Sequence, residues 1–365
     1  MPRSRSGVRV LLLADTRLGF DLPRHPRVTR RRRGHDFFDN YQRVLDTVPK
    51  SGADLVVHGG DLLFRSKVAV DLVQRALLPL KRVAETGVPV YLVPGNHERS
   101  AIPYALLAEH PHIHVFHKPT TFVAEVRGTR VALAGFPNVR RDVRGQFATV
   151  LEATGWRDAG AGIKLLLMHQ CVEGATVGPA DYVFRAGEDV VRGSDLPSGV
   201  AAVLCGHIHR HQVRTHDLAR RALPSPVFYP GSIERTSFAE KDEPKGYLLL
   251  DFEPGVESGG VLRSWRFEAL PARPMLVRSL QAQGVGRTDL DRMMRAVIAE
   301  APPDAVMRVD LHGDLEPEAL PVVRAAAIRR MTPPMMNLEV RLVDARSRQL
   351  HARTVPFSKR GVLRD

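Results

Sequence analysis

The chain has 365 residues, of which 44% are hydrophobic and 25% are charged, and these proportions exclude intrinsic disorder as its main state. Its apolar runs are far shorter than the ~20 residues of a membrane-spanning helix. Its two cysteines are too few for a disulfide scaffold or a four-cysteine zinc site. Because the apolar runs are short and the cysteines are few, we expect a cytoplasmic protein without membrane association.

The formal net charge is +13, and it is distributed unevenly. The first 34 residues contain ten arginines and two aspartates, and the cluster includes Arg31, Arg32 and Arg33. Such a segment attracts polyanions, because each neutralised phosphate releases condensed counterions. A solvated loop explains the same composition equally well, so charge alone leaves both interpretations open.

Short apolar runs in chain order predict buried strands, each followed by a polar loop. These runs lie at residues 8–14, 55–57, 88–93, 130–136, 163–168 and 200–205. Apolar residues at helical spacing predict helices at residues 37–48 and 68–83. Near-continuous apolar strands that alternate with helices favour an α/β layered fold whose strands are covered on both faces.

The sequence changes character after residue 270, where two prolines mark a boundary. Beyond it, the pattern predicts helices near residues 288–299 and 317–330 and strands near 306–311 and 337–343. We therefore expect a large domain over residues 1–270, a small α/β cap domain over 271–345 and a basic tail over 346–365.

Five of the predicted strands end in residues that can bind a metal or a phosphate. These residues are Asp15, Asp61, Asn96, His97, His169, His207 and His209. Sites in α/β sheets collect outside the carboxyl ends of the strands. Because one such coincidence is weak evidence and five in one chain are strong evidence, the pattern predicts one shared site.

The chemistry of these side chains points to a divalent metal centre. Aspartate, asparagine and histidine together suit Mn²⁺, Fe²⁺, Zn²⁺ or Co²⁺. The carboxylate of Asp61 follows a tight Gly-Gly turn and can bridge two ions. Two metals about 3.5–4 Å apart can activate water for an in-line phosphoryl displacement. Glycines at 59, 60, 95 and 206 allow the backbone to approach such a centre closely.

Five sequence blocks resemble those of the calcineurin-type metallophosphoesterases. They are ADTRLG (14–19), GGD (59–61), PGNHE (94–98), LLMHQ (166–170) and GHIH (206–209). LGF (18–20), YPGSIERTSF (229–238) and KGY (245–247) make the sequence most similar to the SbcD-like nuclease subunits of DNA double-strand-break repair. The resemblance covers residues 7–270, and the later residues resemble that family's capping domain only in their placement.

The resemblance implies a two-sheet sandwich flanked by helices, with two divalent ions, most simply Mn²⁺, at its edge. It assigns Asp15, Asp61 and His209 to the first metal. It assigns Asp61, Asn96, His169 and His207 to the second metal. It places His97 beside the scissile phosphate, where the ring stabilises charge or protonates the leaving oxygen.

One residue departs from the family pattern. The first family motif is Asp-x-His, and here Arg17 stands at the position of the histidine. A guanidinium is always charged and has no lone pair to donate, so it cannot replace the ligand. Three outcomes stay open: a full two-metal enzyme, a weakened or one-metal enzyme, and a subunit that only binds. Arg17 is also a candidate for binding a substrate phosphate.

We expect a metal-dependent phosphodiesterase that acts on DNA, with Arg31, Arg32 and Arg33 contacting the DNA backbone. The resemblance also implies an SbcC-like ATPase partner and a homodimer. Two alternatives remain: a phosphodiesterase or phosphatase for small nucleotide-type substrates, and a non-catalytic DNA-binding adaptor whose first metal has been lost through Arg17. The motif blocks specify metal chemistry and leave the size of the substrate undetermined.

Overall fold

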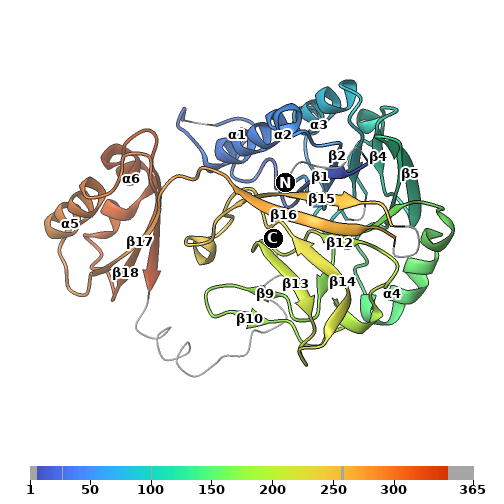
Figure 1. The fold of residues 1–365 in the computed structure, drawn as a ribbon. Coiled ribbons are helices and arrows are strands. Elements are labelled where there is room, and N and C mark those ends of the chain that lie inside the picture. The colour runs from blue at the N-terminus through green and yellow to red at the C-terminus, as the bar shows by residue number, and fades with distance from the viewer. Residues whose placement is uncertain (1–5, 27, 100, 256–258, 344–365) are drawn as a thin grey trace. The chain divides into compact units, whose positions relative to one another are not determined.

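The computed structural model describes residues 6–26, 28–99, 101–255 and 259–343. Its contacts divide the chain into two compact units, coloured from blue to red along the sequence in Figure 1. Unit 1 contains the residues up to Arg24 and Gly34–Ala272, and unit 2 contains His25–Arg33 and the residues from Arg273 onward. The predicted basic tail lies outside the described residues.

Two six-stranded sheets form unit 1. The first sheet has the order β16 (Val261–Ala269), β15 (Gly246–Glu253), β1 (Val8–Leu13), β2 (Leu55–His58), β3 (Val90–Leu92), β4 (Ile113–Val115). The second has the order β13 (Gln212–His216), β14 (Ala222–Tyr229), β12 (Ala202–Cys205), β7 (Ile163–Met168), β6 (Thr129–Gly135), β5 (Thr120–Val126). The central strands of both sheets pair in parallel, and antiparallel strands lie toward the edges.

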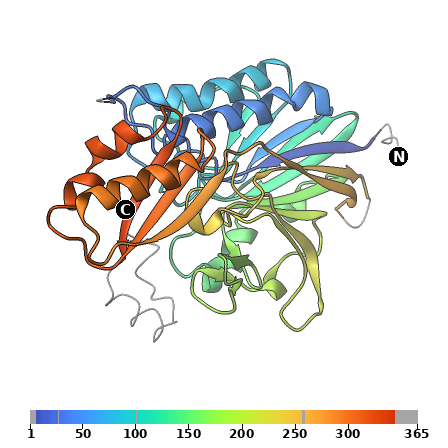
Figure 2. The ribbon, with the colours of Figure 1, turned by 90° about the vertical axis from the view of Figure 1, so that its left-hand side faces the viewer.

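The apolar strands are buried on both faces because helices cover the outer face of each sheet. Alternate residues such as Val10, Leu12 and Leu165 form the core between the two sheets. The residues between them point outward, and those of the first sheet pack against α1 (Arg33–Asp46) and α3 (Val70–Glu85). α4 (Val143–Glu152) covers the second sheet, and the layers are visible edge-on in Figure 2. The predicted two-sheet α/β sandwich is therefore confirmed.

Shorter elements complete unit 1. They are α2 (Val48–Ser51), the paired strands β8 (Cys171–Val172) and β11 (Val190–Val191), and the hairpin of β9 (Thr176–Val177) and β10 (Tyr182–Val183). Single 3-10 turns lie at Ala105–Ala108, Trp156–Asp158, Gly193–Asp195 and Phe238–Glu240.

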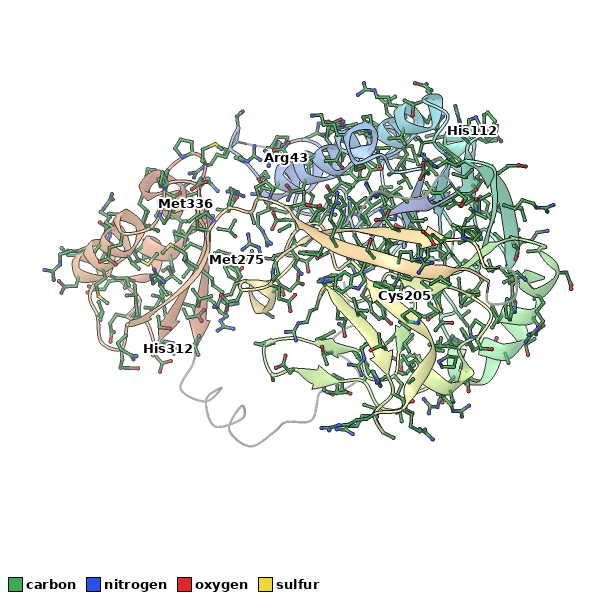
Figure 3. The ribbon with its side chains drawn as sticks, in the orientation of Figure 1. Arg43, His112, Cys205, Met275, His312 and Met336 are labelled. Carbon is green, nitrogen blue, oxygen red and sulfur yellow. The ribbon has the colours of Figure 1, made fainter. Side chains whose placement is uncertain are left out.

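Unit 2 contains a parallel three-stranded sheet of β17 (Met275–Gln281), β18 (Val306–His312) and β19 (Asn337–Val343). Helix α5 (Arg287–Ala299) packs on it through Met294 and Val297. Figure 3 labels Met275 and Met336, both buried, and His312 at the end of β18.

Two expectations for unit 2 were incomplete. The single helix predicted at 317–330 is wrong: the structure has a 3-10 turn at Leu320–Val323 followed by the short helix α6 (Ala325–Met331). Arg324 between them has an extended backbone with ψ 145°, and Pro321 cannot donate a helical hydrogen bond, so one continuous helix cannot form. The sequence analysis also missed β17, which is mostly half-exposed and therefore lacks a continuous apolar run.

Among the described residues, no helix is both long enough and apolar enough to cross a bilayer.

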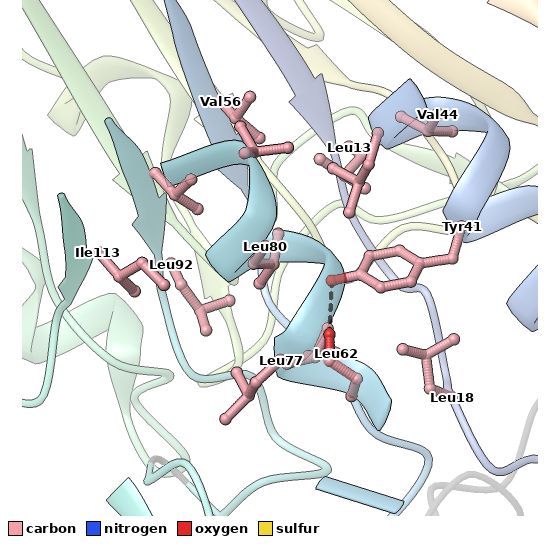
Figure 4. Close-up of a cluster of buried hydrophobic side chains, with 14 of the residues drawn as sticks. Leu13, Leu18, Tyr41, Val44, Val56, Leu62, Leu77, Leu80, Leu92 and Ile113 are labelled. Atoms are coloured by element: carbon pink, nitrogen blue, oxygen red, sulfur yellow. Dashed lines mark hydrogen bonds between the residues drawn. The ribbon is translucent and has the colours of Figure 1, made fainter. Parts of the chain in front are cut away.

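A buried hydrogen bond joins the two helices that cover the first sheet (Figure 4). The hydroxyl of Tyr41 on α1 donates to the carbonyl of Ala76 on α3 over 2.9 Å, and the tyrosine is fully buried. We predict that Tyr41→Phe lowers the free energy of unfolding by about 0.5–1.5 kcal/mol, the usual net contribution of one hydrogen bond. Urea titration followed by tryptophan fluorescence measures it, because Trp156 and Trp265 both belong to unit 1.

The matched control is Tyr104→Phe, since Tyr104 is 52% exposed. This change should alter the free energy of unfolding by less than about 0.5 kcal/mol. Equal effects of the two substitutions would show that the hydrogen bond does not stabilise the packing of α1 on α3.

Candidate metal centre

The parallel central strands bring the predicted ligands to one edge of unit 1. Asp15 follows β1, Asp61 follows β2, His169 follows β7 and His207 follows β12. β1 pairs with β2 in one sheet, and β7 pairs with β12 in the other. Ligand atoms of Asp15, Asp61 and His169 all lie within 4.8 Å of one another, and all three residues are fully buried.

The turns that carry these side chains have strained backbone conformations. Asp15, Asp61 and His207 have φ of 50°, 54° and 85°, in the left-handed region that residues other than glycine rarely adopt. Each such residue costs on the order of 1–3 kcal/mol, and strain of this kind clusters at functional sites. Gly95 is also required, because a Cβ there would overlap Oδ1 of Asp61.

Four atoms whose lone pairs could bind a metal ion converge in one half of the cluster. Oδ1 of Asn96 lies 3.0 Å from Nε2 of His169 and 3.1 Å from Nδ1 of His207. Oδ1 of Asp61 lies 3.5 Å from the same Nε2 of His169. These side chains are the ones that the sequence analysis assigned to the second metal.

The hydrogen bonds of His169 show that this half needs either a proton or a metal ion. Its Nδ1 lies 2.7 Å from the carbonyl oxygen of Gly59, which can only accept, so Nδ1 carries the hydrogen. In the neutral ring Nε2 then presents a lone pair toward the oxygens of Asn96 and Asp61. Lone pairs on three converging atoms repel one another unless a proton or a metal ion lies between them. The donor set therefore fits a divalent ion.

The pKa values in this cluster reflect the same demand for positive charge. Burial disfavours the charged ring of His169, but the carboxylates of Asp61 and Asp15 outweigh burial and raise the pKa of His169 to about 9. Burial likewise acts to raise the pKa of Asp61, but His169 and Arg17 hold it well below its usual range. Burial and the neighbouring His169 lower the pKa of His207 to about 3, so His207 is neutral and can act as a ligand.

The other half of the cluster contains Asp15, the second oxygen of Asp61, and His209. Oδ2 of Asp15 accepts from the backbone N–H of His207 at 2.9 Å, which orients the carboxylate. Oδ1 of Asp15 is buried, has no hydrogen-bond partner among the described residues, and lies 3.8 Å from Nε2 of His209. An orphaned buried carboxylate oxygen fits a cation nearby.

Arg17 lies in this second half. Its Nη2 is 2.9 Å from Oδ2 of Asp61 and 2.9 Å from Nε2 of His209, and its Nη1 is 2.6 Å from Nε2 of His97. The ring of His97 is held from its other side, where Nδ1 donates to the carbonyl of Phe64 at 2.5 Å. Burial, followed by the adjacent Arg17, lowers the pKa of His97, so its ring is neutral.

Glu98 is a supporting residue that the sequence analysis missed. Its buried carboxyl accepts from the backbone N–H groups of Leu63 at 2.7 Å, Gly95 at 2.8 Å and Asp61 at 3.1 Å. It therefore ties the loop after β2 to the loop after β3, which carries Asn96. Burial, followed by the neighbouring Asp61, raises the pKa of Glu98 to about 8. The only sequence signal was an acidic residue directly after Asn-His.

A second missed group orients His209. Oε1 of Glu240 lies 3.1 Å from Nδ1 of His209, and Lys245 pairs with Oε2 of Glu240 at 2.8 Å. Burial opposes the charge on Glu240, but His209 and Lys245 lower its pKa well below the usual range. A carboxylate can only accept, so Nδ1 of His209 carries the hydrogen and Nε2 presents its lone pair to the cluster, where it accepts from Arg17. Glu240 is 31 residues from His209, and no local pattern links them.

The arginines predicted to contact DNA are not part of this cluster. Arg31, Arg32 and Arg33 belong to unit 2 and are half-buried. The carbonyl of Arg31 accepts from the side chain of Asn337, and the preceding Arg30 donates to Oγ1 of Thr332 at 2.9 Å.

The two-sheet fold and the buried Asp/His cluster together define a metallophosphoesterase type of centre. A sequence profile described as calcineurin-like phosphoesterase matches residues 8–211 of the chain. The chain belongs to this family.

The chain is also similar to curated proteins called DNA double-strand break repair protein Mre11. The Aeropyrum pernix protein is 26% identical over 255 residues, which are 67% of this chain and 58% of that protein. The Haloferax volcanii protein is 26% identical over 331 residues, which are 88% of this chain and 65% of that protein. The chain thus spans a little over half the length of several of these relatives.

Among solved structures, the chain resembles a dimetal phosphatase from Danio rerio with a TM-score of 0.41 and 12% identity. That match covers 67% of this chain and 92% of the other.

We predict that Glu98→Gln weakens the binding of Mn²⁺ by about 10–100-fold, the usual effect of losing a partner that positions a metal ligand. The amide has one acceptor oxygen, so at least one of the three backbone N–H groups would face its NH₂ group, and the Asp61 loop would shift. Isothermal titration with Mn²⁺ measures the change. The exposed Glu109→Gln is the control, and unchanged affinity in Glu98→Gln would contradict the positioning role.

Proposed function

We propose that this protein is a metal-dependent phosphodiesterase that hydrolyses DNA, with metal ligands among Asp15, Asp61, Asn96, His169, His207 and His209. The observation that carries the proposal is the convergence of the side-chain oxygens of Asn96 and Asp61 on Nε2 of His169, whose Nδ1 donates to the carbonyl of Gly59. A buried cluster of lone pairs after the carboxyl ends of the strands fits a cation, and family membership supports phosphoester chemistry at that cation.

The chemistry divides between a metal and this chain's own residues. A divalent ion, when bound, polarises a phosphate oxygen and favours deprotonation of the attacking water. A bond forms between the water oxygen and phosphorus, the bond to the leaving oxygen breaks, and the leaving oxygen takes up a proton. Mn²⁺ is the ion that we propose, on the evidence of the mixed oxygen and imidazole donors.

His97 is the proposed catalytic residue beside the scissile phosphate. Its Nδ1–H is fixed on the carbonyl of Phe64, so only Nε2 can face the substrate. In the described structure Nε2 accepts from Arg17. The ring must therefore exchange this contact for a proton before it can protonate the leaving oxygen.

DNA is the proposed substrate for two reasons. The chain has a net charge of +13, and such an excess favours a polyanion. The relatives described above are called DNA double-strand break repair proteins. By the same resemblance we propose an SbcC-like ATPase partner and a homodimer, with Arg31, Arg32 and Arg33 as contacts to the DNA backbone.

We predict Mn²⁺-dependent cleavage of linear DNA by the purified chain, with Asp61→Asn slowing it by about a hundredfold or more. The amide removes one negative charge from the centre, and metal stabilisation of the transition state is worth several kcal/mol. The exposed Asp46→Asn, at the end of α1, is the control and should cleave normally. If the wild-type chain with Mn²⁺ cleaves neither single- nor double-stranded DNA, the proposal fails.

The salt dependence of binding distinguishes a DNA substrate from a small phosphodiester substrate. A site that neutralises about six phosphates should lose about 10³-fold in DNA affinity between 50 and 200 mM salt. Fluorescence anisotropy of a labelled duplex measures this dependence. A small phosphodiester contacts a single phosphate, so its turnover should change little over the same range. Turnover of the small ester without any binding of DNA at low salt would favour the alternative of a small nucleotide-type substrate.

A further inference from the structure

The guanidinium of Arg17 lies among the metal-ligating atoms rather than at the protein surface. Its side chain is 15% exposed, and the side chain of its partner Asp61 is fully buried. The backbone N–H of Arg17 donates to the carbonyl of Asp61 at 3.0 Å, and Arg17 itself has φ of 47°. The loop after β1 is therefore attached to the loop after β2, and this attachment directs the arginine into the cluster.

Two atoms that the first metal would need are already engaged by this arginine. Nη2 lies 2.9 Å from Oδ2 of Asp61 and 2.9 Å from Nε2 of His209. The other nitrogen of His209 faces Glu240 at 3.1 Å, so the lone pair on Nε2 accepts from the guanidinium. One N–H-bearing nitrogen thus bridges a carboxylate and an imidazole, as a metal ion would.

A guanidinium and a divalent ion exclude each other at this position. Both carry positive charge, and a guanidinium has no lone pair to offer as a ligand. An ion bound by Asp61 Oδ2 and His209 would lie against Nη2, in a buried place where like charges repel strongly. The first metal therefore fits only if Arg17 leaves.

The other half of the cluster carries no such competitor among the described residues. Asn96, His169 and His207 converge there with Oδ1 of Asp61, and the nitrogen and oxygen atoms of these side chains lie 3.0–3.5 Å apart. The two oxygens of Asp61 thus face different groups: Nη2 of Arg17 lies 2.9 Å from Oδ2, and Nε2 of His169 lies 3.5 Å from Oδ1.

We propose that the centre binds one divalent ion, held by Asp61, Asn96, His169 and His207, and that the guanidinium of Arg17 takes the place of the first metal. This inference rests on the proposed phosphodiesterase function and specifies its centre. Arg17 then presents two N–H groups to the oxygens of a substrate phosphate, which replace its contacts with His97 and His209. The permanent single positive charge of Arg17 then provides the electrostatic stabilisation that the first metal ion would otherwise provide. Unlike a metal ion, this charge does not have to be bound from solution.

The test counts metal ions instead of measuring rates. Purified wild-type chain saturated with Mn²⁺ and freed of excess should contain one ion per chain by elemental analysis. Its electron paramagnetic resonance spectrum should be that of an isolated Mn²⁺ ion. Two ions per chain with an exchange-coupled spectrum would overturn the proposal, and this measurement needs no variant.

Arg17→His tests the cause. It restores an imidazole at the position of the missing ligand, so the variant should bind two Mn²⁺ ions per chain and give the spectrum of a coupled pair. Arg24→His, at a side chain that is 65% exposed, removes the same charge outside the cluster and should keep one ion. Circular dichroism checks that each variant is folded. A folded Arg17→His chain that still holds one ion would show that Arg17 is not what excludes the second.

Failure of this inference is distinct from failure of the proposed function. A wild-type chain that holds two ions and cleaves DNA would retain the function and refute the single-ion centre. A wild-type chain that holds one ion and cleaves no DNA would support the single-ion centre and refute the nuclease.

Discussion

Two fully buried carboxylates, Asp15 and Asp61, impose the constraint that shapes this protein. A buried carboxylate is costly unless a cation or hydrogen-bond donors compensate its charge. Here the compensation comes from Arg17, from the raised pKa of His169, and from backbone N–H groups of His97 and His207. The edge of the sandwich is therefore a place built to hold positive charge.

The rest of the site follows from keeping these carboxylates in position. Asp15, Arg17, Asp61 and His207 all have left-handed backbones, which costs free energy that the packed sheets on either side must supply. Glu98 fixes the loops after β2 and β3 from behind, and Glu240 fixes the ring of His209. The supporting carboxylates of Glu98 and Glu240 determine which nitrogen of His209 faces the cluster and where Asp61 points.

Membership of the calcineurin-like phosphoesterase family and the particular centre of this chain are separate findings. The family is shown by residues 8–211, and the sandwich with its strand-end ligands agrees with it. The pairing of Arg17 with Asp61 and His209 places a single positive charge in one half of the cluster. On the proposed single-ion centre, proteins that share this fold can differ in how much of the positive charge at the site comes from metal ions and how much from side chains.

Local sequence patterns determined six of the twelve sandwich strands, β1, β2, β3, β6, β7 and β12, and the residues that follow them, because burial on both faces demands apolar runs and each run ends where polar loops begin. The other six strands of the two sheets were not predicted. The sequence analysis did not predict the helix break at Arg324 or the half-exposed strand β17. The break does not interrupt the local periodicity of apolar residues, and β17 does not create one. Only the tertiary structure decided the roles of Glu98, Glu240 and Arg17. Their partners lie 31 to 192 residues away or act through backbone N–H groups, and such contacts exist only once the two sheets have packed and their loops meet at one edge.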